Sequence, residues 1–346
     1  MRLRITPLLV VALLAAACGA PAAESPETIK LIAHDSFAGA VDEETFAGFT
    51  DETGIEVEVI AAGDAGSMVN QAVLSKDNPL ADVLFGVDDV FLSRALDEEI
   101  FVEHSSDLLH EVVNGLYDGN QFVTPIDFGD VCINYDKAWF EEAQLPVPTE
   151  LDQLRAPVYA SILTVEHPAT SSPGLAFMLA TIRDIGEGDD WLDFWADLKA
   201  GGVHVVPDWD TAYYSDFTRY GGDSAMVVSY ASSPPAEVVF ATEPLDEAPT
   251  GVIETGCYRQ VEYAGILSGT EYPEAAADLI DFMLSVEFQE TIPLNWFVFP
   301  ANRNAELPEV FTENTTVPEF AGRFTPETVA RDRDNWIDQW VAVMEG

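Results

Sequence analysis

The sequence predicts an α/β protein with two lobes and a largely parallel sheet. Three observations predict this fold: strand-like and helix-like segments alternate, two long β-rich segments separate the alternating blocks, and 48% of the 346 residues are hydrophobic. Alternating strands and helices are typical of βαβ units, whose strands run parallel. A chain of this length and apolar content is long enough to bury two substantial cores.

The first block alternates regularly from a strand expected within 28–37. Phe46 and Phe49 are at helical spacing, and Gly54 is a typical C-terminal stop for their helix. The expected elements in order are a helix over 42–54, a strand over 55–62, a helix over 67–76, a strand over 81–86 and a helix over 89–99.

The second block contains the two long β-rich segments, 122–137 and 257–269, which suit a hinge because each separates two blocks. We therefore expect residues 29–131 with about 262–312 to form lobe 1, and residues 132–261 with about 313–346 to form lobe 2. The other elements expected here are helices near 174–185, 189–200, 210–220, 271–292 and 325–344, and strands over 202–206 and 224–230.

The chain is strongly acidic, with 15 Lys and Arg residues against 61 Asp and Glu residues and a formal net charge of −46. Nucleic-acid binding needs a basic surface, so this charge argues against it, and also against adhesion to anionic lipid through basic residues. We interpret the acidity as a surface adapted for solubility. A cationic ligand is the second interpretation.

The N-terminus has the features of an export signal. Residues 1–18 combine a positively charged start, an apolar run shorter than the about 20 residues of a membrane span, and small residues ending at Cys18. We interpret 1–18 as a lipoprotein-type signal segment and 19–28 as a tether. Cys18 would carry the lipid, although Ala15 stands where the lipobox usually has Leu, and plain secretory cleavage is the alternative. The mature protein would be an exported cell-surface lipoprotein or a periplasmic protein, with a lipid anchor as its only membrane attachment.

The sequence lacks the common catalytic and metal-binding motifs. It has no HExxH, CxxC, GxSxG or P-loop pattern, and its five His residues show no metal-ligand spacing. We therefore predict a protein that is not an enzyme and has neither a metal site nor a cofactor. Apart from Cys18, two cysteines remain, Cys132 and Cys257, and this even number suggests a disulfide in an exported protein. The sequence alone does not show that they meet.

Two Ser-Ser-Pro segments precede helix-like runs, at 171–173 and 232–234. Ser at an N-cap and Pro at N1 are usual helix starts, so capping alone is one interpretation. The other is ligand binding, because a helix start offers free N–H groups and the positive end of the helix dipole to an oxygen or a phosphate. Trp209, Tyr230 and Trp296 stand in nearby loops, where aromatic rings suit the walls of a site for a flat or cationic ligand.

At these residues the chain resembles the thiamine-binding substrate-binding proteins of bacterial ABC importers, over nearly its whole mature length. The resemblance implies a type II periplasmic-binding-protein fold, with a ligand cleft between two α/β lobes that close by hinge motion. It also implies a monomer that delivers thiamine to the permease of an ABC importer. The matching segments are "DSFA", "SMVNQ", "ADVLFGVD", "TPIDFGDVCINYDK", "HPATSSPGLAFML", "VPDWDTAY", "VVSYASSP", "QVEYAG", "EFQETIPLNWFVFPAN" and "FTPETVARDRDNWIDQW".

The resemblance also implies the roles of individual residues. Asp64 would hydrogen-bond the aminopyrimidine, the serines would hold the hydroxyethyl or phosphate end, and the aromatic residues would wall the rings. The chain departs from the family pattern in the first loop, where the family has an aromatic pair and this chain has His34 and about Val41. The lack of Lys or Arg near the serines favours thiamine over its monophosphate or pyrophosphate. The predicted ligand-binding residues are Asp64, Ala65, Ser171, Ser172, Trp209, Tyr230, Ala231, Ser232, Ser233, Pro234 and Trp296.

In this fold the two hinge strands are neighbours, so the resemblance implies a disulfide between Cys132 and Cys257. Two other functions are alternatives. Ferric-binding relatives use adjacent tyrosines, which Tyr213 and Tyr214 would provide. Thiamine-degrading enzymes of this fold use a Cys nucleophile and a Glu base, for which Cys132 and Glu262 are the candidates, and a disulfide at Cys132 would abolish that reaction.

Overall fold

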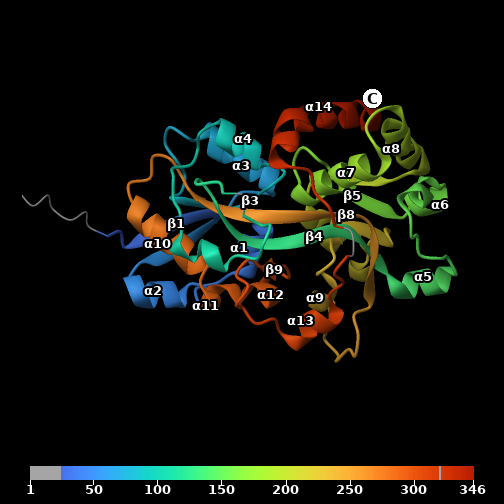
Figure 1. Ribbon diagram of the computed structural model, residues 1–346. Helices are drawn as coiled ribbons and strands as arrows, with labels where there is room; N and C mark the ends of the chain where they lie inside the picture. Colours follow the sequence, from blue (N-terminus) through green and yellow to red (C-terminus); the bar gives the residue numbers. More distant parts are fainter. Residues whose placement is uncertain (1–24, 118, 319–320) are drawn as a thin grey trace, which may run out of the picture.

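A mixed sheet of nine strands runs through the molecule, and helices cover both of its faces (Figure 1). The computed structural model describes residues 25–117, 119–318 and 321–346, so the predicted signal segment, Cys18 and most of the predicted tether lie outside the described residues. The strands are β1 (Thr28–Ala33), β2 (Glu56–Ala61), β3 (Val83–Asp88), β4 (Thr124–Asp136), β5 (Leu163–Glu166), β6 (His204–Val206), β7 (Met226–Tyr230), β8 (Thr250–Ile266) and β9 (Phe299–Pro300).

The sheet is parallel toward both of its ends and antiparallel in its centre. Its order is β2-β1-β3-β8-β4-β7-β5-β6, with β9 paired to β4. β1 pairs in parallel with β2 and β3, and β5 with β6 and β7, whereas the β3–β8, β8–β4 and β4–β7 pairs are antiparallel. The prediction of a largely parallel sheet was therefore correct for the two ends and wrong for the centre, where the long strands β4 and β8 run side by side (Figure 1).

The helices pack on both faces because successive residues of a strand point to opposite faces. In β1, Leu31 belongs to one apolar cluster and Ile32 to the other, and Val83 and Leu84 of β3 divide in the same way. The helices are α1 (Asp35–Ala40), α2 (Ala47–Thr53), α3 (Ala65–Leu74), α4 (Leu92–Asp97), α5 (Lys137–Ala143), α6 (Pro157–Ala160), α7 (Ser172–Ile185), α8 (Asp189–Gly201), α9 (Pro234–Val239), α10 (Pro273–Met283), α11 (Val286–Gln289), α12 (Ile292–Asn295), α13 (Glu309–Asn314) and α14 (Pro326–Met344).

Two predicted elements are divided in the structure. The strand expected within 28–37 ends at Ala33, because the His34 side chain accepts the Phe37 N–H and caps α1. The helix expected over 271–292 stops at Met283, because the Ser285 hydroxyl caps the separate helix α11. Among the described residues, no helix combines the length and the apolar character that a membrane span requires.

Two ends of the molecule meet along the central strands. We call β1, β2 and β3 with their helices the β1 side, and β5, β6 and β7 with theirs the β5 side. In Figure 1, α2 and α10 lie at the outer end of the β1 side, and α5, α6 and α8 lie at the outer end of the β5 side. Helix α14 packs against α8 and against α4. The C-terminal helix therefore contacts both sides.

Candidate functional site

A cavity of about 580 Å³ opens between the β1 side and the β5 side, over the centre of the sheet. Seven of the eleven predicted ligand-binding residues line it: Asp64, Ala65, Ser172, Trp209, Tyr230, Ser233 and Trp296. The other four, Ser171, Ala231, Ser232 and Pro234, are buried in the segments next to the lining residues. The structure thus brings both Ser-Ser-Pro segments and all three predicted aromatic residues to one place.

The two sides touch directly at the edge of the cavity. The backbone N–H of Gly66, at the start of α3, donates to the Thr170 carbonyl at 3.1 Å. The Trp209 N–H donates to the Asp64 carboxylate at 3.4 Å, and the same carboxylate accepts the Ala65 N–H at 2.8 Å. Burial raises the pKa of Asp64, while the Ala65 N–H opposes that shift. Asp64 therefore serves as the N-cap of α3 and as a contact between the two sides.

The Trp209 ring is fixed by its neighbours on the β5 side. Its indole N–H donates to the Ser229 hydroxyl at 2.9 Å, and Ser229 is 2.9 Å from the Ser233 hydroxyl. The ring stacks on Tyr213, with centroids 5.0 Å apart. Tyr213 lies in the π-helical turn Thr211–Asp216, and such turns often mark functional sites. The helix predicted over 210–220 is thus this turn followed by a short 3₁₀ turn at Thr218–Tyr220.

Replacing Ser229 by Ala is expected to loosen the Trp209 ring. The substitution leaves the half-buried indole N–H without its acceptor, so we expect a loss of about 1 kcal/mol in the free energy of unfolding. Urea unfolding measures this loss. Ser229→Thr, which keeps the hydroxyl, is the matched control, and equal stability of wild type and Ser229→Ala would contradict the assigned role.

On the β1 side the Trp296 ring packs edge-on against Phe37, with centroids 5.0 Å apart, and its N–H donates to the Asp127 carboxylate at 3.0 Å. Tyr230 closes the cavity near the centre of the sheet. Its ring lies against Gly129, where an added Cβ would come within 2.7 Å of it, and its hydroxyl donates to Gln260 at 3.3 Å. The three rings are therefore held by specific contacts rather than by general packing.

The serines of the two helix starts do not act as side-chain caps. Ser171 is the N-cap of the 14-residue helix α7 and Ser233 that of α9, yet neither hydroxyl makes a capping hydrogen bond. Ser172 and Ser233 line the cavity. The capping interpretation therefore explains the positions of these serines but not their hydroxyl groups.

Three acidic residues form a row across the central strands. Glu262 of β8 is in register with Asp88 of β3 and with Asp127 of β4, and all three are buried. Like charges directly opposite each other destabilise a sheet. Burial and the neighbouring acids raise the pKa values of Asp88 and Asp127 well above the ordinary range, and burial raises the pKa of Glu262 to about 8. Of these three residues Glu262 lines the cavity.

The raised pKa of Glu262 predicts a pH-dependent stability. Between the ordinary value of 4.5 and about 8, the folded protein keeps a proton that the unfolded chain has released. The free energy of unfolding therefore falls as the pH rises through this range. Glu262→Gln is expected to reduce the fall between pH 5 and pH 8 by at least about 1 kcal/mol, because one pKa unit corresponds to about 1.4 kcal/mol.

Urea unfolding at the two pH values measures this difference. Glu254→Gln is the matched control, since it removes the same charge from an exposed position of β8. An unchanged pH dependence in Glu262→Gln would show that Glu262 is ionised in the folded protein at neutral pH.

The structure also bears on the two alternative functions. Cys132 and Cys257 form a disulfide, as the sequence analysis expected, so Cys132 is not a free thiolate. The buried Tyr213 hydroxyl donates to the Glu237 carboxylate at 3.0 Å, and burial raises its pKa well above the ordinary range. The disulfide removes the free thiolate that a thiamine-degrading enzyme requires. The raised pKa of Tyr213 opposes the phenolate that ferric-ion binding requires. In the described part of the chain, no group of three His, Cys, Asp or Glu residues is placed to hold a metal ion.

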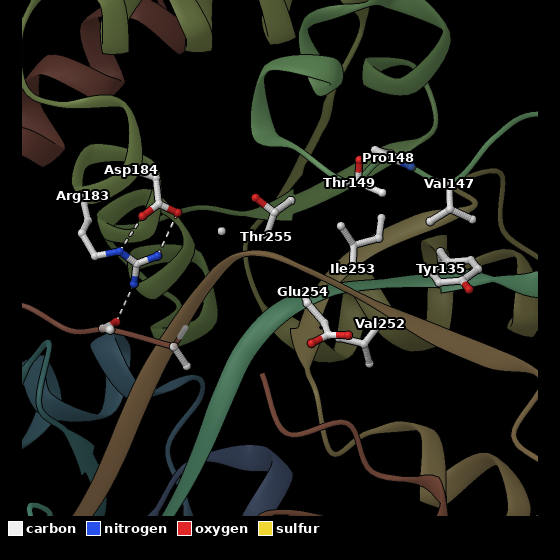
Figure 2. Close-up of a pocket in the computed structure, with 13 residues that line it drawn as sticks. Tyr135, Val147, Pro148, Thr149, Arg183, Asp184, Val252, Ile253, Glu254 and Thr255 are labelled. Atoms are coloured by element: carbon white, nitrogen blue, oxygen red, sulfur yellow. Dashed lines mark hydrogen bonds and ion pairs between the residues drawn. The ribbon is translucent and has the colours of Figure 1, made fainter. Parts of the chain in front are cut away.

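A second hollow, of about 780 Å³, lies over the outer parts of β4 and β8 (Figure 2). Its arginine, Arg183, donates to the Asp184 carboxylate and to the carbonyls of Cys257 and Gly322. Figure 2 shows this guanidinium turned onto Asp184 rather than into the hollow. The hollow is wide open and has no tryptophan in its lining, so the cavity at the centre of the sheet is the better candidate site.

A mixed sheet with a cavity between its two sides, walled by aromatic rings and helix starts, defines the class of extracytoplasmic solute-binding proteins. Residues 78–318 match the family of bacterial extracellular solute-binding proteins, and the chain belongs to this family. Proteins of this class are exported, bind a small molecule and deliver it to the permease of an ABC importer.

The chain is also similar to thiamine-binding proteins of known name. The chain is 31% identical to the thiamine-binding periplasmic protein of Escherichia coli (strain K12), over 93% of this chain and 95% of that protein. A solved periplasmic thiamin binding protein superposes with a TM-score of 0.82 at 27% identity, over 93% and 98% of the two chains. Iron-bound HitA from Pseudomonas aeruginosa, with a TM-score of 0.69 and 20% identity over 92% and 99%, shows the shared fold alone. These matches confirm the predicted resemblance and the type II fold.

Several lining residues were not among the predicted binding residues. Phe240 and Phe297 face each other at 5.5 Å between their ring centroids, and Asn295 lines the cavity close to them. His34 was noted only as a departure from the family pattern, and Glu262 only as the base of an alternative enzyme. Of these residues only Glu262 lies in a strand, so only its position depends on strand register, while the others lie at helix ends or in loops.

Proposed function

We propose that this protein captures thiamine outside the cytoplasm and delivers it to an ABC importer. The observation that carries the proposal is the cavity itself, in which three aromatic walls, one helix-capping carboxylate and two serine hydroxyls converge. Thiamine has a flat aminopyrimidine, a cationic thiazolium and a hydroxyethyl arm, and these groups match the walls, the carboxylate and the hydroxyls in chemistry. The thiamine-binding relatives support the same ligand.

In this proposal the lining residues keep the roles that the resemblance implied. Asp64 accepts a hydrogen bond from the aminopyrimidine, and Trp209, Tyr230 and Trp296 wall the rings. Ser172 and Ser233 hold the hydroxyethyl arm directly. Ser171 and Ser232, to which the resemblance gave the same role, are buried next to them, with Ala231 and Pro234 in the same segments. The lining has no Lys or Arg among the described residues, which favours thiamine over its phosphates.

We further propose that the two sides move as two lobes, with residues 29–131 and about 262–312 in one and 132–261 and about 313–346 in the other. β4 and β8 act as the hinge strands between them. The mature protein acts as a monomer without a cofactor, does not catalyse a reaction, and is tethered to the membrane through a lipid on Cys18 or released into the periplasm.

Intrinsic tryptophan fluorescence tests the proposed ligand. Thiamine is expected to quench the emission saturably at sub-micromolar concentration, with weaker binding of thiamine monophosphate and no saturable response to ferric ion. Asp64→Asn is expected to weaken thiamine binding about tenfold, because it replaces a charged hydrogen-bond acceptor. Trp139→Phe, on α5 and outside the cavity lining, is the control and is expected to bind as the wild type does. Absence of any saturable response to thiamine would refute the proposed function.

A further inference from the structure

Glu262 is the lining carboxylate whose charge is least compensated by the protein. Asp35 is exposed and accepts the Gly63 N–H at 2.7 Å. Asp64 accepts two backbone N–H groups, and Asp210 stands exposed at the mouth of the cavity.

Glu262 is only 7% exposed. Its neighbours are side chains: the Gln260 amide at 3.5 Å, the His34 ring at 3.4 Å and the Asp127 carboxyl.

The His34 ring lies 3.4 Å from the Glu262 carboxylate as a neutral tautomer. Its Nδ1 accepts the Phe37 N–H at 3.2 Å, so the ring proton is on Nε2, the atom that faces the Glu262 carboxylate. Burial also lowers the pKa of His34. This ring makes no hydrogen bond to Glu262 in the structure, and it does not supply a positive charge.

The elements around Glu262 supply further acids and aromatic rings. The titratable groups that face it are Asp127 of β4, Asp88 of β3, Asp64 of α3, Tyr230 of β7 and His34 before α1. Among the described residues that line the cavity there is no Lys or Arg. A buried carboxylate without a cation is costly, and such a group becomes protonated unless a positive charge is brought to it.

Two of the aromatic residues that line the cavity are hydrogen-bonded to neighbours of this carboxylate. Tyr230 hydrogen-bonds Gln260, which is two residues from Glu262, and Trp296 hydrogen-bonds Asp127, its register partner. An acidic floor between aromatic rings suits a cation that is delocalised over a flat ring. The site can therefore bind one positive charge, and the described lining residues supply no Lys or Arg to neutralise Glu262.

We propose that Glu262 is the residue that recognises the positive charge of the ligand, and that ligand binding expels one proton from the Asp127–Glu262 pair. This inference rests on the proposed function, since it assigns the thiazolium of thiamine to the Glu262 carboxylate. In the empty protein at neutral pH, the pair holds a proton on each carboxyl. When the cation binds, Glu262 ionises, its proton passes to the solvent, and Asp127 keeps its own proton and donates it to Glu262.

A neutral analogue of thiamine tests the charge recognition. Deazathiamine has carbon in place of the positively charged ring nitrogen and nearly the same shape. Wild-type protein is expected to bind thiamine at least about tenfold more tightly than deazathiamine at pH 8. Glu262→Gln is expected to lose most of this preference, through weaker thiamine binding with deazathiamine binding nearly unchanged. Glu254→Gln, on the exposed part of β8, is expected to keep the preference.

Calorimetry of the wild-type protein provides a test that does not depend on a variant. Thiamine binding at pH 7 is measured in phosphate and in Tris, whose ionisation enthalpies differ, and the difference gives the number of protons released. We expect nearly one proton, and an affinity that rises about tenfold per pH unit below pH 8 and then levels off. Binding of thiamine with no proton release, or an equal preference in wild type and Glu262→Gln, would overturn this inference. If the wild type binds neither compound, it is the proposed function that fails.

Discussion

Replacing both Cys132 and Cys257 by alanine is expected to lower the free energy of unfolding by about 4 kcal/mol. The disulfide joins residues that are 125 positions apart in the sequence. Closing a loop of this length removes conformational entropy from the unfolded chain. For a loop of about 100 residues, the folded state is stabilised by about 4.7 kcal/mol. Urea unfolding of the oxidised wild type and of the double variant measures the difference, and the m-value shows whether the unfolded chain has expanded.

The site of the disulfide gives this prediction a second basis. The ladder between β4 and β8 is interrupted there: Val131 pairs with Tyr258, but Ile133 pairs with Ile253. Four residues of β8 therefore lie opposite Cys132, and Gly256 among them has a φ of 70°, which favours glycine. The covalent bond joins the two strands where backbone hydrogen bonds do not.

Two controls separate the disulfide from the loss of two buried thiols. The wild type in a reducing agent is expected to lose nearly as much stability as the double variant. Cys18→Ser is expected to leave the stability unchanged, since Cys18 has no role in the predicted pair. A loss below about 1 kcal/mol in the double variant would show that the unfolded chain is already restricted without the bond.

The sequence was sufficient to predict the order and type of most elements. Apolar periodicity located α3, α8 and α14 to within a few residues, because each of these helices has one apolar face. Helix α7 was found by its Ser-Ser-Pro start, although nearly all of it is buried. The predictions failed where short side-chain contacts decide, as in the His34 cap that ends β1 and the Ser285 cap that divides α10 from α11.

The candidate site was predictable only in part, and the reason is strand register. Residues at helix starts and in aromatic loops carry local signals, so Asp64, Ser172 and Trp209 could be found. The acidic row could not, because Asp88, Asp127 and Glu262 are far apart in the sequence and meet only through the pairing of three strands. A one-residue shift in any of these pairings would turn one acid to the opposite face.

Replacing Gly66 by alanine is expected to weaken thiamine binding about 100-fold, corresponding to about 3 kcal/mol. An added Cβ would come within 2.8 Å of the Thr170 carbonyl oxygen and 3.0 Å of the Ala169 carbonyl oxygen, both on the β5 side, and within 2.8 Å of the Phe91 ring. The two backbone carbonyls are held by the turn before α7 and cannot withdraw as a flexible side chain would. The two sides must therefore separate, and the hydrogen bond from the Gly66 N–H is lost.

The loss of affinity follows from the population of the closed state. If ligand binds tightly only when both sides contact it, a variant that closes rarely has an apparent Kd that is higher by the same factor. Fluorescence titration gives the Kd, and small-angle scattering with and without thiamine shows whether the variant still becomes more compact. Gly39→Ala is the matched control, since it also adds a methyl group to a lining residue, and an added Cβ there has no atom within 4 Å.

These measurements distinguish closure from damage to the fold. Gly66→Ala is expected to keep a cooperative unfolding transition, because two of its three close contacts are to backbone carbonyls of the β5 side and only the third, to the Phe91 ring, reaches an apolar cluster. A variant that binds thiamine as tightly as Gly39→Ala and still becomes compact would show that the contact between Gly66 and Thr170 does not limit closure. A 100-fold loss with compaction abolished would instead establish that this glycine is required because two backbones approach each other there, a constraint of the bound state rather than of folding.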